Sequence, residues 1–195
     1  MITIKNNSIN EIIIKNSRFI TLLYKINSID EITKYLDEAK KLYPKATHYC
    51  YAYILNEYKR SSDDGEPGGT AGLPILNVLE KENINKVLVI VVRYFGGIKL
   101  GAGGLVRAYS KSVKEAITNS EIISLIPGKL IEIIFDYPQQ KQLDYLLKES
   151  IIIKQEFNEQ ITYHVLISND NLDKLNNYNY IVLNDEYIEK DSNII

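Results

Sequence analysis

Residues 87–109 read VLVIVVRYFGGIKLGAGGLVRAY, and they carry the clearest indication of the fold. The stretch opens with the aliphatic run Val87–Val92, which is typical of a strand buried on both faces of a sheet. The glycine-rich segment Gly96–Gly104 follows, and apolar residues then recur at helical spacing as far as Asn119. The stretch therefore predicts a buried strand, a tight loop and an amphipathic helix, all within a domain that mixes strands and helices.

Glycines are concentrated in one part of the chain. Nine of the ten lie between Gly65 and Gly104, where they mark two loops. Three of the four arginines, Arg60, Arg93 and Arg107, flank these loops. Because glycine lets a ligand or another backbone approach closely, the clustering points to a functional centre at the two loops.

The second loop, Gly96–Gly104, is the candidate binding site. It leads from a buried strand into a helix, and the free N–H groups and dipole at a helix start favour an anion. The residues expected to hold a phosphate, RNA or another ligand lie in and around this loop: Arg93, Gly96, Gly97, Lys99, Gly101, Gly103, Gly104, Arg107, Lys111 and Lys114. The alternative is a packing turn in which the glycines only admit neighbouring backbone.

Known nucleotide motifs do not fit this loop. Gly96 and Gly101 have the Walker spacing, but Ala102 and Gly103 stand where lysine and a hydroxyl residue are needed. The dinucleotide fingerprint fails because position 106 is Val106. On the helix beyond the loop, Arg107, Lys111 and Lys114 recur at the spacing i, i+4, i+7. Such a basic stripe suits a phosphate backbone but is also typical of a solvated face.

The first loop, Lys59–Gly69, carries three carboxylates. They do not match the twelve-residue calcium loop, and hard cations usually need more oxygen ligands than this segment offers. We expect the motif residues to be structural, with carboxylates that bond backbone amides or pair with Arg60 or Arg93. These motif residues are Asp63, Asp64, Gly65, Glu66 and Pro67. Neither a metal nor a cofactor is predicted.

His48 and Cys50 are two residues apart in a predicted strand, Thr47–Leu55, so they share one face. A nucleophilic Cys–His pair needs a third group to orient the base, and none is identifiable here. A buried structural cysteine is the commoner case, and no catalytic residue is predicted.

The remaining pattern predicts two domains, residues 1–127 and 128–195, divided at Ile126-Pro127-Gly128. In the first part, further strands are expected at 11–15 and 18–26, and helices at 29–43 and 72–82. In the second part, strands and helices alternate in the order βαββαβ of a ferredoxin-like domain. These elements are expected at 130–135, 138–149, 151–157, 161–167, near 172–175, and at 180–183.

Composition and charge agree with two folded domains. Of 195 residues, 45% are hydrophobic and 25% charged, which excludes a disordered or collagen-like chain. Residues 1–127 carry 17 Lys and Arg against 13 Asp and Glu, a net charge of +4, whereas residues 128–195 carry 6 against 12, a net charge of −6. No signal peptide or membrane-spanning run is visible, so a soluble cytoplasmic protein is expected.

Three long motifs resemble the IMPACT family, and in particular its bacterial YigZ-like members. They read ATHYCYAY at 46–53, SDDGEPGGTAGLPIL at 62–76 and VVRYFGGIKLGAGGLVRAY at 91–109. The resemblance implies an α+β protein of two domains. The first would be a left-handed βαβ domain like that of a small-subunit ribosomal protein and of domain IV of elongation factor G. The second would be a ferredoxin-like domain similar to domain V of that factor.

Eukaryotic members of the family regulate translation by competing for a ribosome-associated activator of a starvation-responsive kinase. The resemblance assigns no catalytic role to any residue here. We therefore expect a non-catalytic binding or regulatory protein of the translation apparatus, with RNA or the ribosome as its partner and without DNA specificity or membrane contact.

Two alternatives stay open. One is an enzyme that binds a small molecule or nucleotide in a cleft between the two glycine-rich loops, and ligand-induced thermal stabilisation would reveal it. The other is a regulator that captures a protein partner through the acidic second domain, which residues 128–195 alone would then recover.

Overall fold

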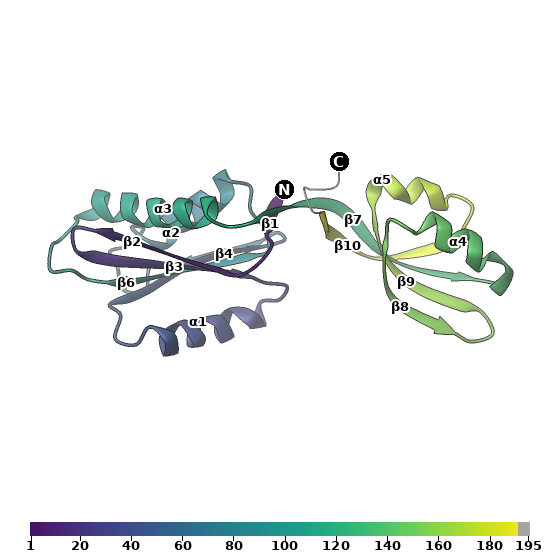
Figure 1. The fold of residues 1–195 in the computed structure, drawn as a ribbon, viewed down its shortest axis with the longest axis horizontal. Helices are drawn as coiled ribbons and strands as arrows, with labels where there is room; N and C mark the ends of the chain where they lie inside the picture. Colours follow the sequence, from purple (N-terminus) through teal and green to yellow (C-terminus); the bar gives the residue numbers. More distant parts are fainter. Residues whose placement is uncertain (191–195) are drawn as a thin grey trace. The chain divides into compact units, whose positions relative to one another are not determined.

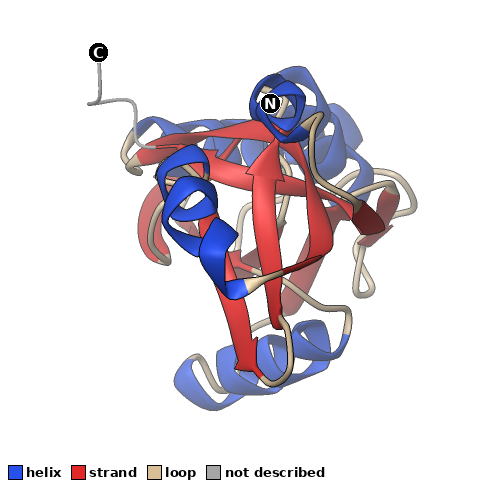
Figure 2. Cartoon of the chain, turned by 90° about the vertical axis from the view of Figure 1, so that its right-hand side faces the viewer, coloured by secondary structure: helices blue, strands red, loops and turns tan. Residues whose placement is uncertain are grey.

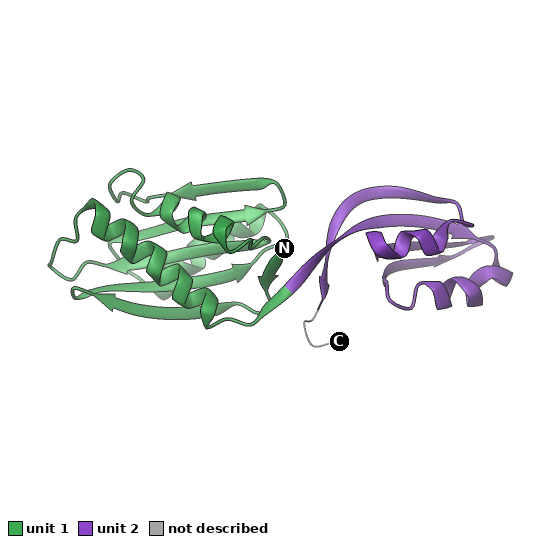
Figure 3. Cartoon of the chain, turned by 90° about the horizontal axis from the view of Figure 1, so that it is seen from above, with its two compact units in different colours: residues 1–123 green, residues 124–195 purple. Residues whose placement is uncertain are grey.

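The computed structural model describes residues 1–190. The chain divides into two compact units, Met1–Ile123 and a second unit that begins at Ser124 (Figure 3). The chain contains both helices and strands (Figure 2), and each unit combines the two, which confirms the predicted α+β class. The predicted division between residues 127 and 128 lies four residues after the division of the compact units, and both fall inside the continuous strand β7 (Ile122–Phe135).

The first unit is built on a five-stranded sheet in the order β2-β3-β6-β4-β5, and all of its neighbouring strands are antiparallel. Its strands are β2 (Ser8–Ile14), β3 (Ser17–Lys25), β4 (His48–Leu55), β5 (Tyr58–Ser62) and β6 (Val87–Tyr94), and the short β1 (Ile2–Ile4) lies outside the sheet. Its helices are α1 (Asp30–Leu42), α2 (Gly72–Lys81) and α3 (Ala102–Thr118).

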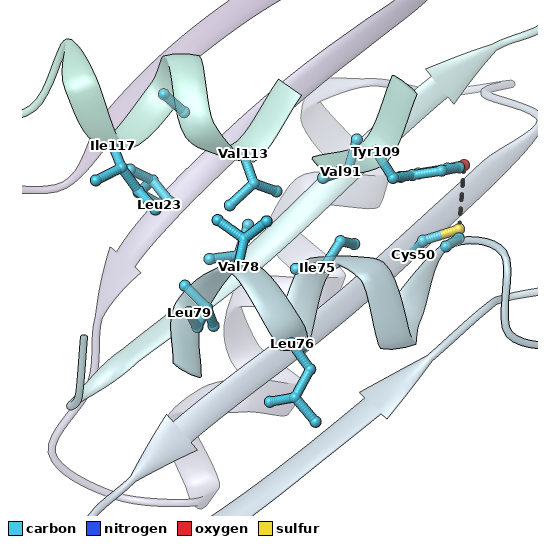
Figure 4. Packing of buried hydrophobic residues seen from close by; sticks show 14 of the residues in the cluster. Leu23, Cys50, Ile75, Leu76, Val78, Leu79, Val91, Tyr109, Val113 and Ile117 are labelled. Carbon is cyan, nitrogen blue, oxygen red and sulfur yellow. Dashed lines mark hydrogen bonds between the residues drawn. The ribbon is translucent and has the colours of Figure 1, made fainter. Parts of the chain in front are cut away.

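Helices cover both faces of this sheet (Figure 1): α1 lies on one face, α2 and α3 on the other. The central strand β6 is therefore enclosed on both sides, and residues Val87–Val92 are 0% exposed, as the aliphatic run predicts. Figure 4 shows the α2/α3 side, where Val78 of α2 lies beside Val113 of α3 and Ile117 of α3 lies beside Leu23 of β3.

One crossover connection in this sheet is left-handed. β3 and β4 run parallel because both are antiparallel to β6, and α1 joins them. β5 and β6 run parallel because both are antiparallel to β4, and α2 joins them. Compared with the first connection, the second starts from a strand of opposite direction and crosses the sheet in the opposite direction, and these two reversals together leave the handedness unchanged. Its helix, however, lies on the opposite face of the sheet, and this third difference inverts the handedness. One of the two must therefore be left-handed, against about 98% right-handed connections in general. This confirms the left-handed βαβ unit that the family resemblance implied.

The prediction of a loop over residues 59–69 is wrong for its first part. β5 pairs with β4 in a hairpin whose turn is Asn56-Glu57, and Asn56 adopts a φ of 53°. β5 lies at the sheet edge, where polar side chains remain exposed, so it lacks the apolar alternation that marks a half-buried strand.

The second unit has the ferredoxin-like element order that the sequence predicts. β7 is followed by α4 (Gln140–Leu146), β8 (Ile151–Phe157), β9 (Ile161–Ser168), α5 (Asn169–Leu172) and β10 (Tyr180–Lys190), with single 3₁₀ turns at Tyr137–Gln139 and Asp173–Leu175. The strands pair antiparallel in the order β10-β7-β9-β8. α4 and the Asp173–Leu175 turn contribute Leu143 and Leu175 to the core over one face of the sheet.

Gly128, which the sequence marks as a domain boundary, is a packing position within β7. A Cβ there would lie 2.6 Å from the Ile167 carbonyl oxygen of β9 and 2.7 Å from Cδ1 of Ile188 on β10. Neighbouring strands crowd this position from two sides, so the glycine permits close packing rather than a break in the chain.

Candidate functional site

The two glycine-rich loops line a single pocket in the first unit, with a volume of about 360 Å³. The first loop contributes Glu66 and Pro67, and the second contributes Lys99–Ala102. The other lining residues come from the start of β4, from β6 and the residue after it, and from α3: Thr47, His48, Arg93, Phe95 and Leu105. The two loops meet because β4 and β6 are neighbouring strands in which His48 lies opposite Arg93.

A buried ion pair lies at the pocket. Arg93 donates from Nη1 to Oε1 of Glu66, and the exposed fractions of the two side chains are only 6% and 3%. The Tyr109 hydroxyl donates to the same carboxylate oxygen over 2.8 Å. The pairing between this loop and Arg93 that the sequence allowed is therefore present, and hydrogen bonds compensate the burial of the carboxylate.

Arg93 is further held by its surroundings. Its guanidinium carbon lies 5.5 Å from the ring centre of Phe19 and 5.6 Å from that of Phe95. Nη2 lies 3.5 Å from the Ser17 hydroxyl, at the limit of a hydrogen bond. Arg93 thus lines the predicted site, but its charge is already committed to Glu66.

The Glu66 carboxylate keeps one open oxygen. No other described residue makes a hydrogen bond to Oε2, which lies 3.8 Å from Nε2 of His48. Nδ1 of His48 lies 2.7 Å from the Asp64 carbonyl oxygen. A carbonyl only accepts, so the neutral imidazole carries its proton on Nδ1 and presents Nε2 as an acceptor.

Asp63 organises the rest of the first loop. Its carboxylate accepts hydrogen bonds from the N–H groups of Gly69, Ala71 and Gly72 over 2.8–2.9 Å, and so caps the start of α2. Burial alone would raise the pKa of the Asp63 carboxyl, but these three donors outweigh it and hold that pKa below its usual value. Asp64 accepts similarly from the Tyr49 N–H over 2.7 Å.

Gly65 completes the turn of this loop. Asp64 and Gly65 have φ values of 42° and 84°, a left-handed pair that glycine relieves at the second position. Pro67 accepts from the Thr70 hydroxyl through its carbonyl over 2.6 Å. Hydrogen bonds to Asp63, Asp64 and Pro67 thus hold the first loop against β4 and the start of α2.

The glycines of the second loop serve two different purposes. A Cβ at Gly96 would lie 2.0 Å from the Asn16 carbonyl carbon, so this glycine permits close backbone packing. Gly97 and Gly101 have φ values of 82° and 70° and open space around the Cβ position. The packing-turn interpretation therefore applies to Gly96, whereas Gly97 and Gly101 face open space.

The start of α3 has free donors. The first helical hydrogen bond runs from the Leu105 N–H to the Gly101 carbonyl, so the N–H groups of residues 102–104 have no partner within the helix. Gly101 provides no side-chain cap, and the first turn contains no acidic residue. This helix start combines free N–H groups with the positive end of the helix dipole.

Exposed basic side chains accompany this helix start. Lys99, Arg107, Lys111 and Lys114 are all exposed. Nζ of Lys111 lies 3.6 Å from a Glu115 carboxylate oxygen, so part of its charge is compensated. Within residues 1–190, the other three make no ion pair.

Cys50 is a core residue. Its thiol lies 2.9 Å from the Asp63 carbonyl oxygen and 3.3 Å from the Tyr109 hydroxyl (Figure 4). Burial raises the pKa of the thiol to about 12, which disfavours the nucleophilic thiolate. The geometry is that of the structural cysteine that the sequence favours over a Cys–His nucleophile.

Two kinds of feature are absent from residues 1–190. No three potential ligand side chains of His, Cys, Asp or Glu gather into a metal-binding group there. None of the helices in that part of the chain has the length and apolarity needed to cross a membrane.

The fold and the double-loop site define a class: two-unit α+β proteins whose first unit carries a left-handed crossover and the glycine-rich pocket. The profile of the Impact N-terminal domain matches residues 15–117. The IMPACT family member YvyE of Bacillus subtilis is 38% identical over 173 residues, which cover 85% of this chain and 78% of that protein. The chain belongs to the IMPACT family, as its motifs predict.

Two further comparisons agree with this assignment. The IMPACT family member YigZ of Escherichia coli is 40% identical over 109 residues, which cover 53% of each chain. The crystal structure of a hypothetical protein superposes with a TM-score of 0.68 at 27% identity, over 93% of this chain and 95% of that one. This superposition extends the likeness in fold over both units.

Proposed function

We propose that this protein is a non-catalytic binding protein of the cytoplasmic translation apparatus that holds RNA through its phosphates. The observation that carries the proposal is the start of α3, where the N–H groups of residues 102–104 have no partner within the helix and the exposed cations Lys99 and Arg107 lie close by in the chain. RNA phosphates are anions that such a helix start and such side chains attract.

The charge distribution supports this assignment. Residues 1–123 carry a net charge of +4, and on α3 the cations Arg107, Lys111 and Lys114 follow one face. The expected contacts are to phosphate and not to base-pair edges, so duplex sequence would matter little. The predicted likeness of the two domains to elongation factor G makes ribosomal RNA the source of the phosphates.

Co-sedimentation with ribosomes over a salt series tests the proposal. We expect Arg107→Glu and Lys114→Glu to weaken binding and to reduce the slope of log affinity against log salt by about 1 for each lost contact. Lys34→Glu is the matched control, because Lys34 is also exposed but lies on α1, over the opposite face of the sheet.

The contrary results are distinct. If the protein does not bind ribosomes even at low salt, the RNA assignment is wrong. If binding persists and all three variants weaken it equally, RNA is bound by another surface.

A further inference from the structure

We propose that the pocket between the two loops receives one unstacked base of single-stranded RNA, and that guanine fits it best. This inference rests on the proposed function, because it places the base beside the phosphates that α3 is proposed to hold. It extends that function from general attraction for phosphate to recognition of a nucleotide.

The size and walls of the pocket suit a base. Its volume of about 360 Å³ falls within the range of roughly 300–1,000 Å³ found for small-ligand sites. The walls include the apolar side chains of Pro67, Leu100 and Leu105. A planar aromatic base buries its faces well against such walls, whereas a bare phosphate would not.

Phe95 provides a stacking surface at this pocket. Its side chain lines the pocket and is still 44% exposed. The Arg93 guanidinium, 5.6 Å from the ring centre, stabilises the position of the ring. Bases of single-stranded nucleic acids stack on exposed aromatic rings of this kind, while a base inside a duplex cannot reach them.

The polar groups of the pocket favour a base edge that donates hydrogen bonds. Glu66 Oε2 belongs to a side chain that is only 3% exposed, and it accepts no hydrogen bond from any other residue in the described range. His48 Nε2, which lies 3.8 Å away, is an acceptor in the neutral ring. Guanine places a ring N–H and an amino group side by side, so it offers two donors to these two acceptors.

The pocket and the proposed phosphate site are continuous. Gly101 and Ala102 line the pocket and also form the start of α3, and Lys99 lies between them and Phe95 in the loop. A nucleotide with its base in the pocket would therefore place its phosphate close to the free N–H groups and to Lys99.

Fluorescence anisotropy of the full chain tests this proposal. The probes are labelled ten-nucleotide oligouridylates in which one central position is guanosine, adenosine, cytidine or an abasic site, with a duplex of the same length. We expect the guanosine probe to bind about tenfold more tightly than the abasic probe, and more tightly than the adenosine and cytidine probes.

Variants assign the preference to the pocket. Phe95→Ala should lower the affinity for the guanosine probe about tenfold and leave the affinity for the abasic probe nearly unchanged. Ile98→Ala is the matched control, because Ile98 is 46% exposed in the same loop but does not line the pocket. Glu66→Gln should abolish the preference for guanosine. Since that change also disturbs the ion pair with Arg93, His48→Phe provides an independent test: it removes the second acceptor and the hydrogen bond to the Asp64 carbonyl but leaves the partners of that ion pair in place.

Three outcomes would overturn the inference. Equal affinity for the guanosine and abasic probes would show that the pocket binds no base. In that case Arg107→Glu would still weaken RNA binding if the proposed function holds. An unchanged preference in both Phe95→Ala and His48→Phe places the base elsewhere. Binding of guanosine monophosphate as tightly as the oligonucleotide would make the site one for a free nucleotide. Failure of every RNA probe would instead contradict the proposed function.

Discussion

Arg93 and Glu66 form an ion pair in which both side chains are more than nine-tenths buried, and this pair joins the first glycine-rich loop to strand β6. Arg93 comes from β6 and Glu66 from the loop after β5, so the contact depends on strand pairing and not on sequence proximity. The pair holds Glu66 at the pocket while the Tyr109 hydroxyl fixes the same carboxylate oxygen.

Removing one partner should be costly. We expect Arg93→Met to lower the free energy of unfolding by about 3–5 kcal/mol, because the Glu66 charge would remain buried and unpaired. Urea denaturation followed by circular dichroism measures this change. The control is Glu80→Gln, which breaks the exposed pair between Lys59 and Glu80 and should cost no more than about 1 kcal/mol. If the two variants lose the same free energy of unfolding, the buried pair stabilises the fold no more than the exposed pair does, which contradicts this prediction.

Asp63 should stabilise the fold in a pH-dependent manner. The pKa of its carboxyl is lowered in the folded protein, so its ionised form stabilises the fold at pH values above the unfolded pKa, about 3.8. That contribution is lost as the pH falls through the lowered folded pKa. We expect Asp63→Ala to cost about 0.5–2 kcal/mol at pH 7 through loss of the helix cap.

NMR titration of the Asp63 carboxyl measures this directly, and its midpoint should lie below 3.8. The difference in stability between wild type and Asp63→Ala should also shrink as the pH falls below that value. A normal midpoint, or a difference that does not change with pH, would show that the three amide donors do not act on the ionised carboxylate.

Gly96 should tolerate no side chain. A Cβ at this position would lie 2.0 Å from the carbonyl carbon of Asn16, so backbone must move. We expect Gly96→Ala to destabilise the protein by about 1–3 kcal/mol, as overpacking against fixed neighbours does. Gly68→Ala is the control, because no atom lies within 4 Å of its Cβ position, and it should change stability by less than about 0.5 kcal/mol. Thermal melting of the two variants decides between these expectations.

Cys50 should be inert in the folded protein. Burial raises the pKa of its thiol to about 12, so very little thiolate exists at pH 8. We expect no reaction with a thiol-specific disulfide reagent at pH 8 under native conditions, and one equivalent of reaction after unfolding in guanidinium. Rapid native labelling would indicate that the α2/α3 core around Cys50 and Tyr109 opens readily.

Local patterns were sufficient for much of the fold. The aliphatic run of β6, the apolar stripe of α3 and the βαββαβ order of the second unit all follow from the spacing of apolar residues along a short segment. The same patterns missed β5, since an edge strand can remain polar. Nor did they reveal that Gly128 permits close packing between strands.

The candidate site was predictable only in part. The two loops are recognisable from their glycines and charges, but His48 and Phe95 gave no local signal of a pocket. They reach it because β4 and β6 pair with His48 opposite Arg93, and a register of strands is a long-range choice. The spacing likewise cannot separate Gly96, which packs against Asn16, from Gly101, which opens onto free space.

The amino-acid sequence was thus enough to establish most of the element types, the two-domain plan and the family, because each depends on neighbouring residues or on long ordered motifs. The left-handed crossover, the buried pair of Arg93 with Glu66 and the pocket with its open carboxylate oxygen arise only when distant segments pack together. Those features depend on which strands pair and which face each helix covers, and these choices are settled by the packing of the whole domain.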